Sequence, residues 1–325
     1  MRIFLHSGVF HADDVFATVT LQTAYPEADQ ILRTRDPAQL AAATQTDFVV
    51  DVGSVYDATQ NRFDHHQVRA TELTRPTTGQ TTWPYAAFGL VWRHHGLKAL
   101  QQLFPHAQRA TLVKTWHNLD DNLVRWLDAS DVGQRPANPN PTQLSRLIHN
   151  FNGHENDSDA NFQRVLPIAR EILHSTALTA YKTAIDEIQM QHLIECRDTS
   201  RAYLELPEFK NWLESVIAYN NNQENATIKY VLFPRPDGSW LAQSAPHPED
   251  TFKPLFPFPD KWAAQKSQSL ANLSGIPDAE FCHAGRHLFI GKSRASVIAA
   301  IECAQLHNAK QQTEQQTEAP HVKGR

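Results

Sequence analysis

Residues 47–66 read DFVVDVGSVYDATQNRFDHH, and this stretch decides the fold class that we predict. Its first part, residues 47–52, is a compact run of apolar and β-branched residues that a glycine closes, a pattern typical of a buried strand. Asp51 lies at the carboxyl end of that strand, and the triplet DHH follows at residues 64–66. In parallel α/β sheets, ligands bind beyond the carboxyl ends of the strands. The stretch therefore indicates a polar site at that edge of a sheet.

Strand-like and helix-like segments alternate through the first half of the chain. Residues 2–5 form a short apolar run before a loop, and residues 14–24 have a helical pattern with acidic residues near their start. Residues 85–96 and 107–130 also have the spacing of helices. This alternation predicts a parallel-sheet α/β domain.

The second half of the chain has a different pattern. A polar loop around residues 153–159 precedes a long helical segment over residues 161–196. From residue 201 onward, strand-like segments and turn signals predominate, which predicts a smaller α+β domain. Residues 309–325 are polar and low in complexity, so we expect a disordered tail.

Composition limits the class of protein. The 325 residues, 41% of them hydrophobic, suggest two domains, and the formal net charge of −5 excludes a broadly basic coat for non-specific nucleic-acid binding. It does not exclude a nucleic acid that is bound through metals and a local basic groove. Three dispersed cysteines argue against a disulfide framework and a thiolate zinc site. No stretch is long and apolar enough for a membrane span, and we expect a cytoplasmic protein.

Histidine and aspartate gather in four short clusters, of which three follow predicted strands and one ends a predicted helix. Imidazole and carboxylate groups without thiolate suit Mn, Fe, Co or Zn better than Ca or Mg. A carboxylate that bridges two ions would give a dinuclear centre for phosphoryl chemistry. Asp64 is a candidate to orient the neighbouring His65. Six candidate ligands result: His6, His11, Asp13, Asp51, His65 and Asp131.

These residues also carry a resemblance to a known family. The DHH triplet matches the motif of the DHH phosphoesterase superfamily, and residues 51–57 (DVGSVYD) with 62–66 (RFDHH) resemble its narrower branch, the MYG1 family (UPF0160). Residues 6–14 (HSGVFHADD) and 128–133 (DASDVG) are similar to further motifs of that family. The resemblance runs from residue 3 to about residue 305, which is nearly the whole folded part.

The resemblance implies a DHH-type α/β catalytic domain over residues 1–155, a helical connector over 156–200, a substrate-binding α+β domain over 201–308 and the tail at 309–325. It also implies two divalent metal ions, usually Mn²⁺, with Mg²⁺, Co²⁺ or Zn²⁺ as alternatives. Asp51 would be the bridging ligand, and the terminal ligands would be His6, His11, Asp13, His65 and Asp131.

Further residues receive roles through the same resemblance. His66 would contact the phosphate or protonate the leaving group, beside Asp64. Asp14 and Asp128 are further candidates, as ligands or as partners of ligands. The choices between His6 and His11, and between Asp128 and Asp131, stay open as direct ligands.

Basic groups that could bind the substrate occur near the start of the last helical segment. Amide groups and cations can meet a phosphate at such a point. The candidates are His283, Arg286, Lys292 and Arg294.

Three functions are compatible with these residues. We expect a metal-dependent phosphodiesterase of the 3′–5′ exonuclease type, acting on RNA or short oligonucleotides. A hydrolase of a small phosphoester or pyrophosphate is the first alternative, and a metal-binding regulatory protein without hydrolase activity is the second. The oligomeric state stays open, with a homodimer as one option, and no membrane partner is expected.

Overall fold

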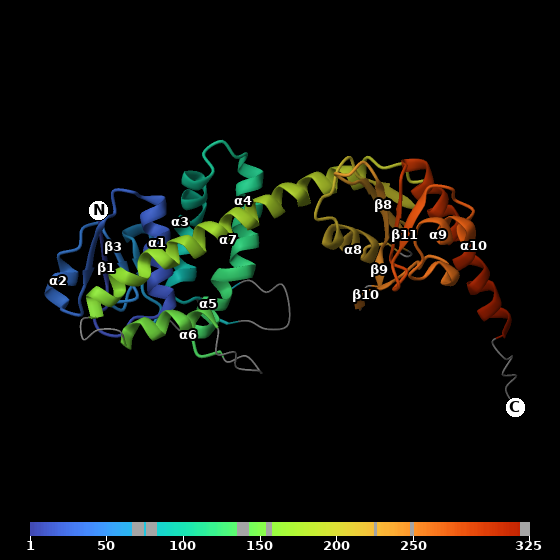
Figure 1. Ribbon diagram of the computed structural model, residues 1–325. Coiled ribbons are helices and arrows are strands. Elements are labelled where there is room, and N and C mark those ends of the chain that lie inside the picture. The colour runs from blue at the N-terminus through green and yellow to red at the C-terminus, as the bar shows by residue number, and fades with distance from the viewer. Residues whose placement is uncertain are drawn as a thin grey trace, which may run out of the picture. The chain divides into compact units, whose positions relative to one another are not determined.

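The computed structural model describes residues 1–66, 75, 83–134, 143–153, 158–223, 226–247 and 250–318. The chain divides into two compact units, Met1–Ile185 and Asp186–Arg325 (Figure 1). The boundary falls inside the helix α7 (Ser158–Glu195), within the segment expected to connect the domains.

A five-stranded sheet forms the centre of the first unit. Its order is β2-β1-β3-β5-β4, and every pair is parallel except β4 with β5. The strands are β1 (Arg2–Leu5), β2 (Gln30–Arg33), β3 (Phe48–Val50), β4 (Tyr56–Asp57) and β5 (Arg62–Phe63). This sheet confirms the fold class predicted for the N-terminal part of the chain.

Helices cover the sheet and continue the alternation along the chain. They are α1 (Ala12–Ala24), α2 (Pro37–Ala41), η1 (Ala58–Gln60), α3 (Ala87–Leu103), α4 (Arg109–Leu119), η2 (Asp120–Val124), α5 (Arg125–Asp131), α6 (Leu144–His149), η3 (Asn150–Gly153) and α7. The predicted helix over residues 107–130 is present, but η2 interrupts it as a turn of π-helix.

The two faces of this sheet carry apolar cores of unequal size, because successive strand residues point to opposite sides. Ile3 and Leu5 belong to a large core that also contains residues of α1 and α3. Phe4 points the other way, into a small cluster with Val49 and Leu40 of α2. The first face therefore carries most of the packing that holds the unit together.

The register of the strands aligns their carboxyl ends. Phe4 pairs with Val49, and Val50 pairs with Phe63. The residues that follow the three strands β1, β3 and β5 consequently reach one edge of the sheet. His6, Asp51 and Asp64 are among these residues.

The second unit is an α+β fold, smaller than the first, as the sequence predicted. Its main sheet has the order β11-β12-β8-β7-β6 and is antiparallel except for β6 with β7. Its strands are β6 (Tyr203–Glu205), β7 (Tyr230–Pro234), β8 (Trp240–Ser244), β11 (Ala279–Cys282) and β12 (Leu288–Gly291), with a separate pair β9 (Pro246–His247) and β10 (Asp250–Pro254). Its helices are α8 (Leu213–Asn221), η4 (Asp260–Trp262), α9 (Ser267–Ser274) and α10 (Arg294–Glu318).

The C-terminal end differs from the expectation of a tail that begins at residue 309. α10 continues to Glu318, because residues 309–318 (AKQQTEQQTE) contain good helix formers and neither glycine nor proline. Residues 319–325 lie outside the described part of the chain. Among the described helices, none combines the length and the apolar character that crossing a membrane requires.

Candidate metal centre

Two imidazoles lie on either side of the Asp51 carboxylate at the edge of the parallel sheet. Nε2 of His6 is 3.3 Å from Oδ2 of Asp51, and Nε2 of His65 is 3.3 Å from Oδ1. Each carboxylate oxygen thus faces a different ring.

The backbone at Asp51 turns sharply directly after β3. Its φ is +56°, in the left-handed region that glycine, asparagine and aspartate tolerate best. The side chain is almost fully buried. Such a backbone is costly and is found most often where the surrounding structure uses it for a site.

The first turn of α1 supplies a second wall of the site. Asp14 accepts a hydrogen bond from the backbone N–H of His11 at 3.1 Å, and its other oxygen lies 3.0 Å from Nε2 of His6. Nδ1 of His6 donates to the carbonyl oxygen of Ser7 at 3.3 Å, which leaves Nε2 directed at the carboxylates. Asp14 therefore fixes the start of the helix and contacts one candidate ligand.

The last residue of α5 closes the site. Asp131 Oδ2 lies 3.3 Å from Nε2 of His65, and its Oδ1 lies 3.8 Å from Nδ1 of His11. Among the described residues, three overlapping groups have ligand atoms close enough to hold an ion, and together they contain all six candidate ligands and His66. The groups are His6 with His11 and Asp51; Asp51 with His65 and His66; and His11 with Asp13 and Asp131.

Buried polar atoms at this site lack hydrogen-bond partners among the residues that the structure describes. They include both carboxylate oxygens of Asp13. Oδ1 of Asp51 and Nε2 of His65 lie 3.3 Å apart as an ion pair but form no hydrogen bond. Burial, and then the neighbouring charges of Asp51 and Asp131, raise the pKa of Asp13 well above its usual range. A buried carboxylate among carboxylates needs a cation, so these residues fit divalent metal ions.

The imidazoles respond to the same carboxylates. Burial disfavours their charged forms, but hydrogen bonds with Asp14 and Asp51 outweigh it and raise the pKa of His6 to about 10. Asp131 and Asp51 likewise raise the pKa of His65 to about 10, against the effect of burial. Metal ligation requires neutral imidazole, so binding of an ion would release protons from this cluster.

His66 is held at the mouth of the site. Its ring Nδ1 lies 2.8 Å from Oδ1 of Asp64, which also accepts the His66 backbone N–H at 3.0 Å. The His66 side chain is 62% exposed, whereas that of Asp64 is buried. We expected Asp64 to orient His65, but its ring partner among the described residues is His66. Asp64 therefore positions an exposed imidazole.

Asp128 lies outside the three groups of described residues that could hold an ion, contrary to the option that it is a ligand. It is fully buried and accepts hydrogen bonds from Nε of Arg75 at 3.1 Å and from the backbone N–H of Gly89 at 2.9 Å. Arg75 also binds Asp120 in η2. The guanidinium and the amide already satisfy Asp128, so it forms a structural ion pair.

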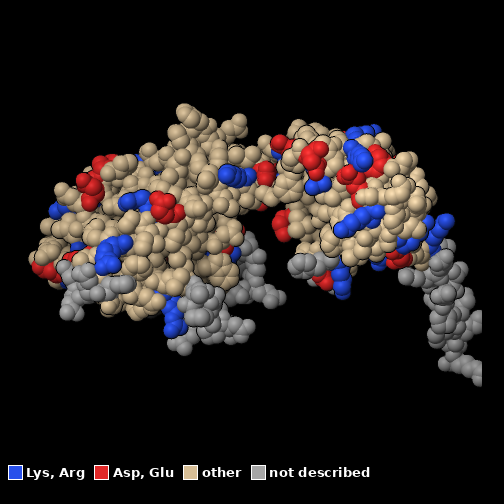
Figure 2. Space-filling view, in the orientation of Figure 1, with Lys and Arg blue, Asp and Glu red and all other residues tan. Residues whose placement is uncertain are grey.

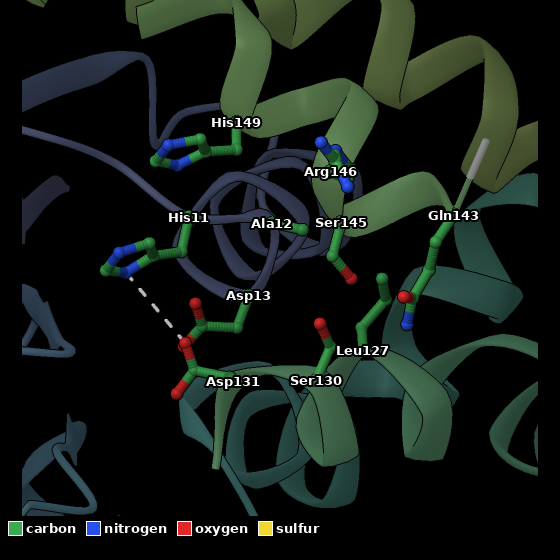
Figure 3. A pocket seen from close by; sticks show the side chains of 10 residues that line it. All are labelled: His11, Ala12, Asp13, Leu127, Ser130, Asp131, Gln143, Ser145, Arg146 and His149. Carbon is green, nitrogen blue, oxygen red and sulfur yellow. Dashed lines mark ion pairs between the residues drawn. The ribbon is translucent and has the colours of Figure 1, made fainter. Parts of the chain in front are cut away.

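A cavity of about 390 Å³ adjoins the centre (Figure 3). One of its walls contains three candidate ligands, His11, Asp13 and Asp131. The other lining residues are Ala12, Leu127, Ser130, Gln143, Ser145, Arg146 and His149, several of them on α6. We did not predict these residues, because α6 is short and its sequence carries no motif. The signal that was present is an arginine and a histidine at helical spacing.

The four candidate substrate residues of the second unit are placed as follows. Arg294 makes two hydrogen bonds with Glu205, of 2.6 and 2.5 Å, and Arg286 pairs with Asp260. Nδ1 of His283 accepts the backbone N–H of Gly285 at 3.0 Å, and Lys292 is exposed. Two of the expected cations therefore already have carboxylate partners, a feature that the local sequence did not indicate.

A parallel α/β sheet whose edge carries imidazoles and carboxylates that could hold metal ions, with the buried Asp13 carboxylate unpartnered among the described residues, fits the class of metal-dependent hydrolases. Residues 2–305 match the family model MYG1 exonuclease, described as "Uncharacterised protein family (UPF0160)". The chain belongs to this family, as the sequence motifs indicated. The family model and the names of related proteins confirm the expected enzyme class, a hydrolase of the exonuclease kind.

Individual relatives extend over most of the chain. The MYG1 exonuclease of Bos taurus is 31% identical over 316 residues, covering 90% of this chain and 81% of the relative. The MYG1 exonuclease of Homo sapiens is 29% identical over 315 residues, covering 90% and 82%. The MYG1 protein of Chlamydia muridarum is 31% identical over 305 residues, covering 91% and 93%. A crystal structure of exonuclease RecJ bound to manganese is a remote match, with 15% identity, a TM-score of 0.26, and coverage of 95% of this chain and 90% of that one.

Proposed function

We propose that this protein is a two-metal phosphodiesterase that removes nucleotides from the 3′ end of RNA or of short oligonucleotides. The observation that carries the proposal is the Asp51 carboxylate, whose two oxygens each face a different imidazole at 3.3 Å. The names of the mammalian relatives support an exonuclease. The RNA substrate and the 3′–5′ direction are what the resemblance to the MYG1 family implies.

The ligand set supports two divalent ions, since mixed imidazole and carboxylate donors suit Mn, Fe, Co or Zn. The resemblance to the MYG1 family favours Mn²⁺ among them. Asp51 would bridge the ions, and the five other ligands would be His6, His11, Asp13, His65 and Asp131. When bound, such ions provide hydroxide at neutral pH and stabilise the charge on the reacting phosphate.

His66 would act on the substrate side of the centre. Its ring is exposed at the mouth of the site and is oriented by the buried Asp64 at 2.8 Å. An imidazole in that position can donate a hydrogen bond to a phosphate oxygen or a proton to the leaving oxygen. Asp64 would keep the ring in that orientation.

The test combines metal binding with hydrolysis. Asp51→Asn keeps a residue that tolerates the left-handed backbone but removes the charge. We expect weaker Mn²⁺ binding by calorimetry, and release of nucleotides from a labelled oligoribonucleotide at least about a thousand-fold slower. Asp121→Asn, which removes an exposed carboxylate of η2, is the matched control. Equal rates for Asp51→Asn and wild type would show that the assigned centre is wrong.

A small phosphoester or pyrophosphate substrate is a second candidate. The cavity of about 390 Å³ favours it, because that volume suits one small ligand. Turnover of an oligonucleotide, a dinucleotide and pyrophosphate, compared at equal concentration, separates the two candidates. Absence of turnover across this panel at full metal occupancy would favour the remaining hypothesis, a metal-binding protein without hydrolase activity.

A further inference from the structure

The cavity beside the metal centre has two chemically different walls. Asp13 and Asp131 form one wall with His11, and α6 contributes Ser145 and Arg146 to the other (Figure 3). The first wall is acidic and repels an anion unless cations are bound there. The second wall offers a guanidinium and a hydroxyl group.

The groups on α6 have no partners of their own in the described part of the chain. Oγ of Ser145 is buried without a hydrogen-bond partner there, and the Arg146 guanidinium is exposed and makes no hydrogen bond or ion pair with a described residue. Arg294, by contrast, is held by two hydrogen bonds to Glu205. A buried hydroxyl without a partner is unfavourable, so the wall is suited to an external acceptor.

His149 joins this wall to the metal centre. Its ring is parallel to that of His11 within 8°, with centroids 6.4 Å apart (Figure 3). His149 and Arg146 lie three residues apart on α6, so they belong to one side of the helix. An anion that binds Arg146 would therefore lie beside a candidate metal ligand.

The chemistry of this wall matches a phosphate group. Arginine binds phosphate oxygens through paired N–H donors, and a serine hydroxyl adds a third donor. The cavity volume of about 390 Å³ suits a single nucleotide rather than a duplex. In proteins that bind nucleic acids, contacts to phosphates fix the position of the chain and leave sequence unread.

We propose that Ser145 and Arg146 form a phosphate-binding subsite, which holds the phosphate next to the scissile one and so sets the position of the terminal nucleotide at the metals. The subsite rests on the proposed function for the identity of its ligand, a nucleotide phosphate. Arg146 is the specificity-determining residue, and Ser145 supports it.

Binding of nucleotides tests the subsite without reference to hydrolysis. Calorimetry compares a nucleoside monophosphate with its nucleoside, on the full chain loaded with Mn²⁺. We expect Arg146→Gln to lower the affinity for the monophosphate roughly 10- to 100-fold, as loss of hydrogen bonds to a charged group predicts. The affinity for the nucleoside should stay unchanged. Arg146→Lys should restore part of the affinity. Arg109→Gln, an exposed arginine at the start of α4 that does not line the cavity, is the charge-matched control.

Hydrolysis adds a second comparison. Wild type should favour a dinucleotide with a 5′-phosphate over one without it, through a lower KM, and Arg146→Gln should remove that preference while Mn²⁺ affinity is unchanged. If the variant keeps both its monophosphate affinity and the preference, the subsite is wrong. If the affinity falls as expected but wild type hydrolyses neither dinucleotide, the subsite stands and the proposed nuclease function fails. Thermal unfolding checks that the variant is folded.

Discussion

Asp128 and Asp131 lie one turn apart on α5, and their surroundings are opposite. Asp128 is fully buried and receives the Arg75 guanidinium and the backbone N–H of Gly89. Asp131 is half-buried and faces His65 and His11 beside the unpartnered Asp13. One carboxylate is thus neutralised within the protein, whereas the other belongs to an excess of negative charge. The difference separates a residue that stabilises the fold from one that is available to an ion.

Helix α3 packs so closely against the Asp128 carboxylate that no ion could fit between them. A Cβ atom at Gly89 would lie 1.9 Å from Oδ2 of Asp128, so only glycine allows α3 to approach so closely. The buried pair with Arg75 is consequently part of the packing between α3 and α5. Removal of one member of such a pair leaves an uncompensated charge in the interior.

The largest effect that would distinguish the two aspartates is expected for Asp131→Asn. It should reduce hydrolysis by at least about a thousand-fold, because a metal-dependent reaction loses several kcal/mol of transition-state stabilisation. The unfolding free energy of the metal-free protein should hardly change. Steady-state rates and urea denaturation measure the two quantities. Full activity of Asp131→Asn would contradict the conclusion that Asp131, unlike Asp128, is available to a metal ion.

Asp128→Asn should have the converse effect. Loss of the charge opposite Arg75 should lower the unfolding free energy by about 3 kcal/mol. The protein that remains folded should still bind Mn²⁺ with wild-type affinity. Asp121→Asn is the control, since it removes the partner of Arg125 at the surface and should cost less than about 0.5 kcal/mol. If Asp128→Asn lost metal affinity but kept its stability, Asp128 would be a metal ligand and not a residue that stabilises the fold.

His95 extends the comparison to a buried ionisable group without a carboxylate partner among the described residues. Burial, aided by nearby His94 and Lys98, lowers its pKa to about 4 from 6.5. A histidine whose pKa is lower in the folded than in the unfolded state contributes to stability at pH values above the unfolded pKa of 6.5. As the pH falls from 6.5 toward 4, the free energy of unfolding should decrease by up to about 3 kcal/mol. His95→Phe retains ring packing against Phe48 and Phe63 but removes the titration. Denaturation at several pH values should therefore show a shallower acid dependence than wild type, and equal slopes would contradict this.

Asp14→Asn should produce the smallest change of the four. Asparagine can still accept the His11 backbone N–H, so α1 should begin at the same residue. The contact with Nε2 of His6 would lose its charge, and we expect a 10- to 100-fold weaker metal affinity, roughly that of other partners of metal ligands. Calorimetry with Mn²⁺ measures the change. A loss as large as that of Asp131→Asn would instead identify Asp14 as a direct ligand.

The meeting of Asp51 with His65 could be predicted from sequence because both follow short strands of a parallel sheet. Once the alternation of strands and helices indicates such a sheet, the carboxyl ends of neighbouring strands must share an edge. The position of Asp131 at the same site also agrees with its motif. The local pattern was sufficient for these residues because the sheet carries them to a common place.

The role of Asp128 could not be predicted in the same way. Its partner Arg75 lies 53 positions away in the sequence, and no periodicity links the two. The proposed subsite on α6 could not be predicted for a related reason. Ser145 and Arg146 belong to a six-residue helix, and only the fold brings their side chains into the cavity that Asp13 also lines. The ion pairs of Arg286 and Arg294 likewise depend on contacts distant in sequence.

The turn of π-helix at η2 determines how helix α5, which follows it directly, is rotated about its axis. In an α-helix each residue advances the chain by about 100°, and a π turn accommodates an additional residue within the helix. Deletion of one residue between Asp120 and Val124 would restore regular winding and rotate α5 by about that angle. Asp128 would then turn away from Arg75, and Asp131 from His65, in a single step. This wide turn therefore aligns one side of α5 with two separate partners, Arg75 in the interior and His65 at the edge of the sheet.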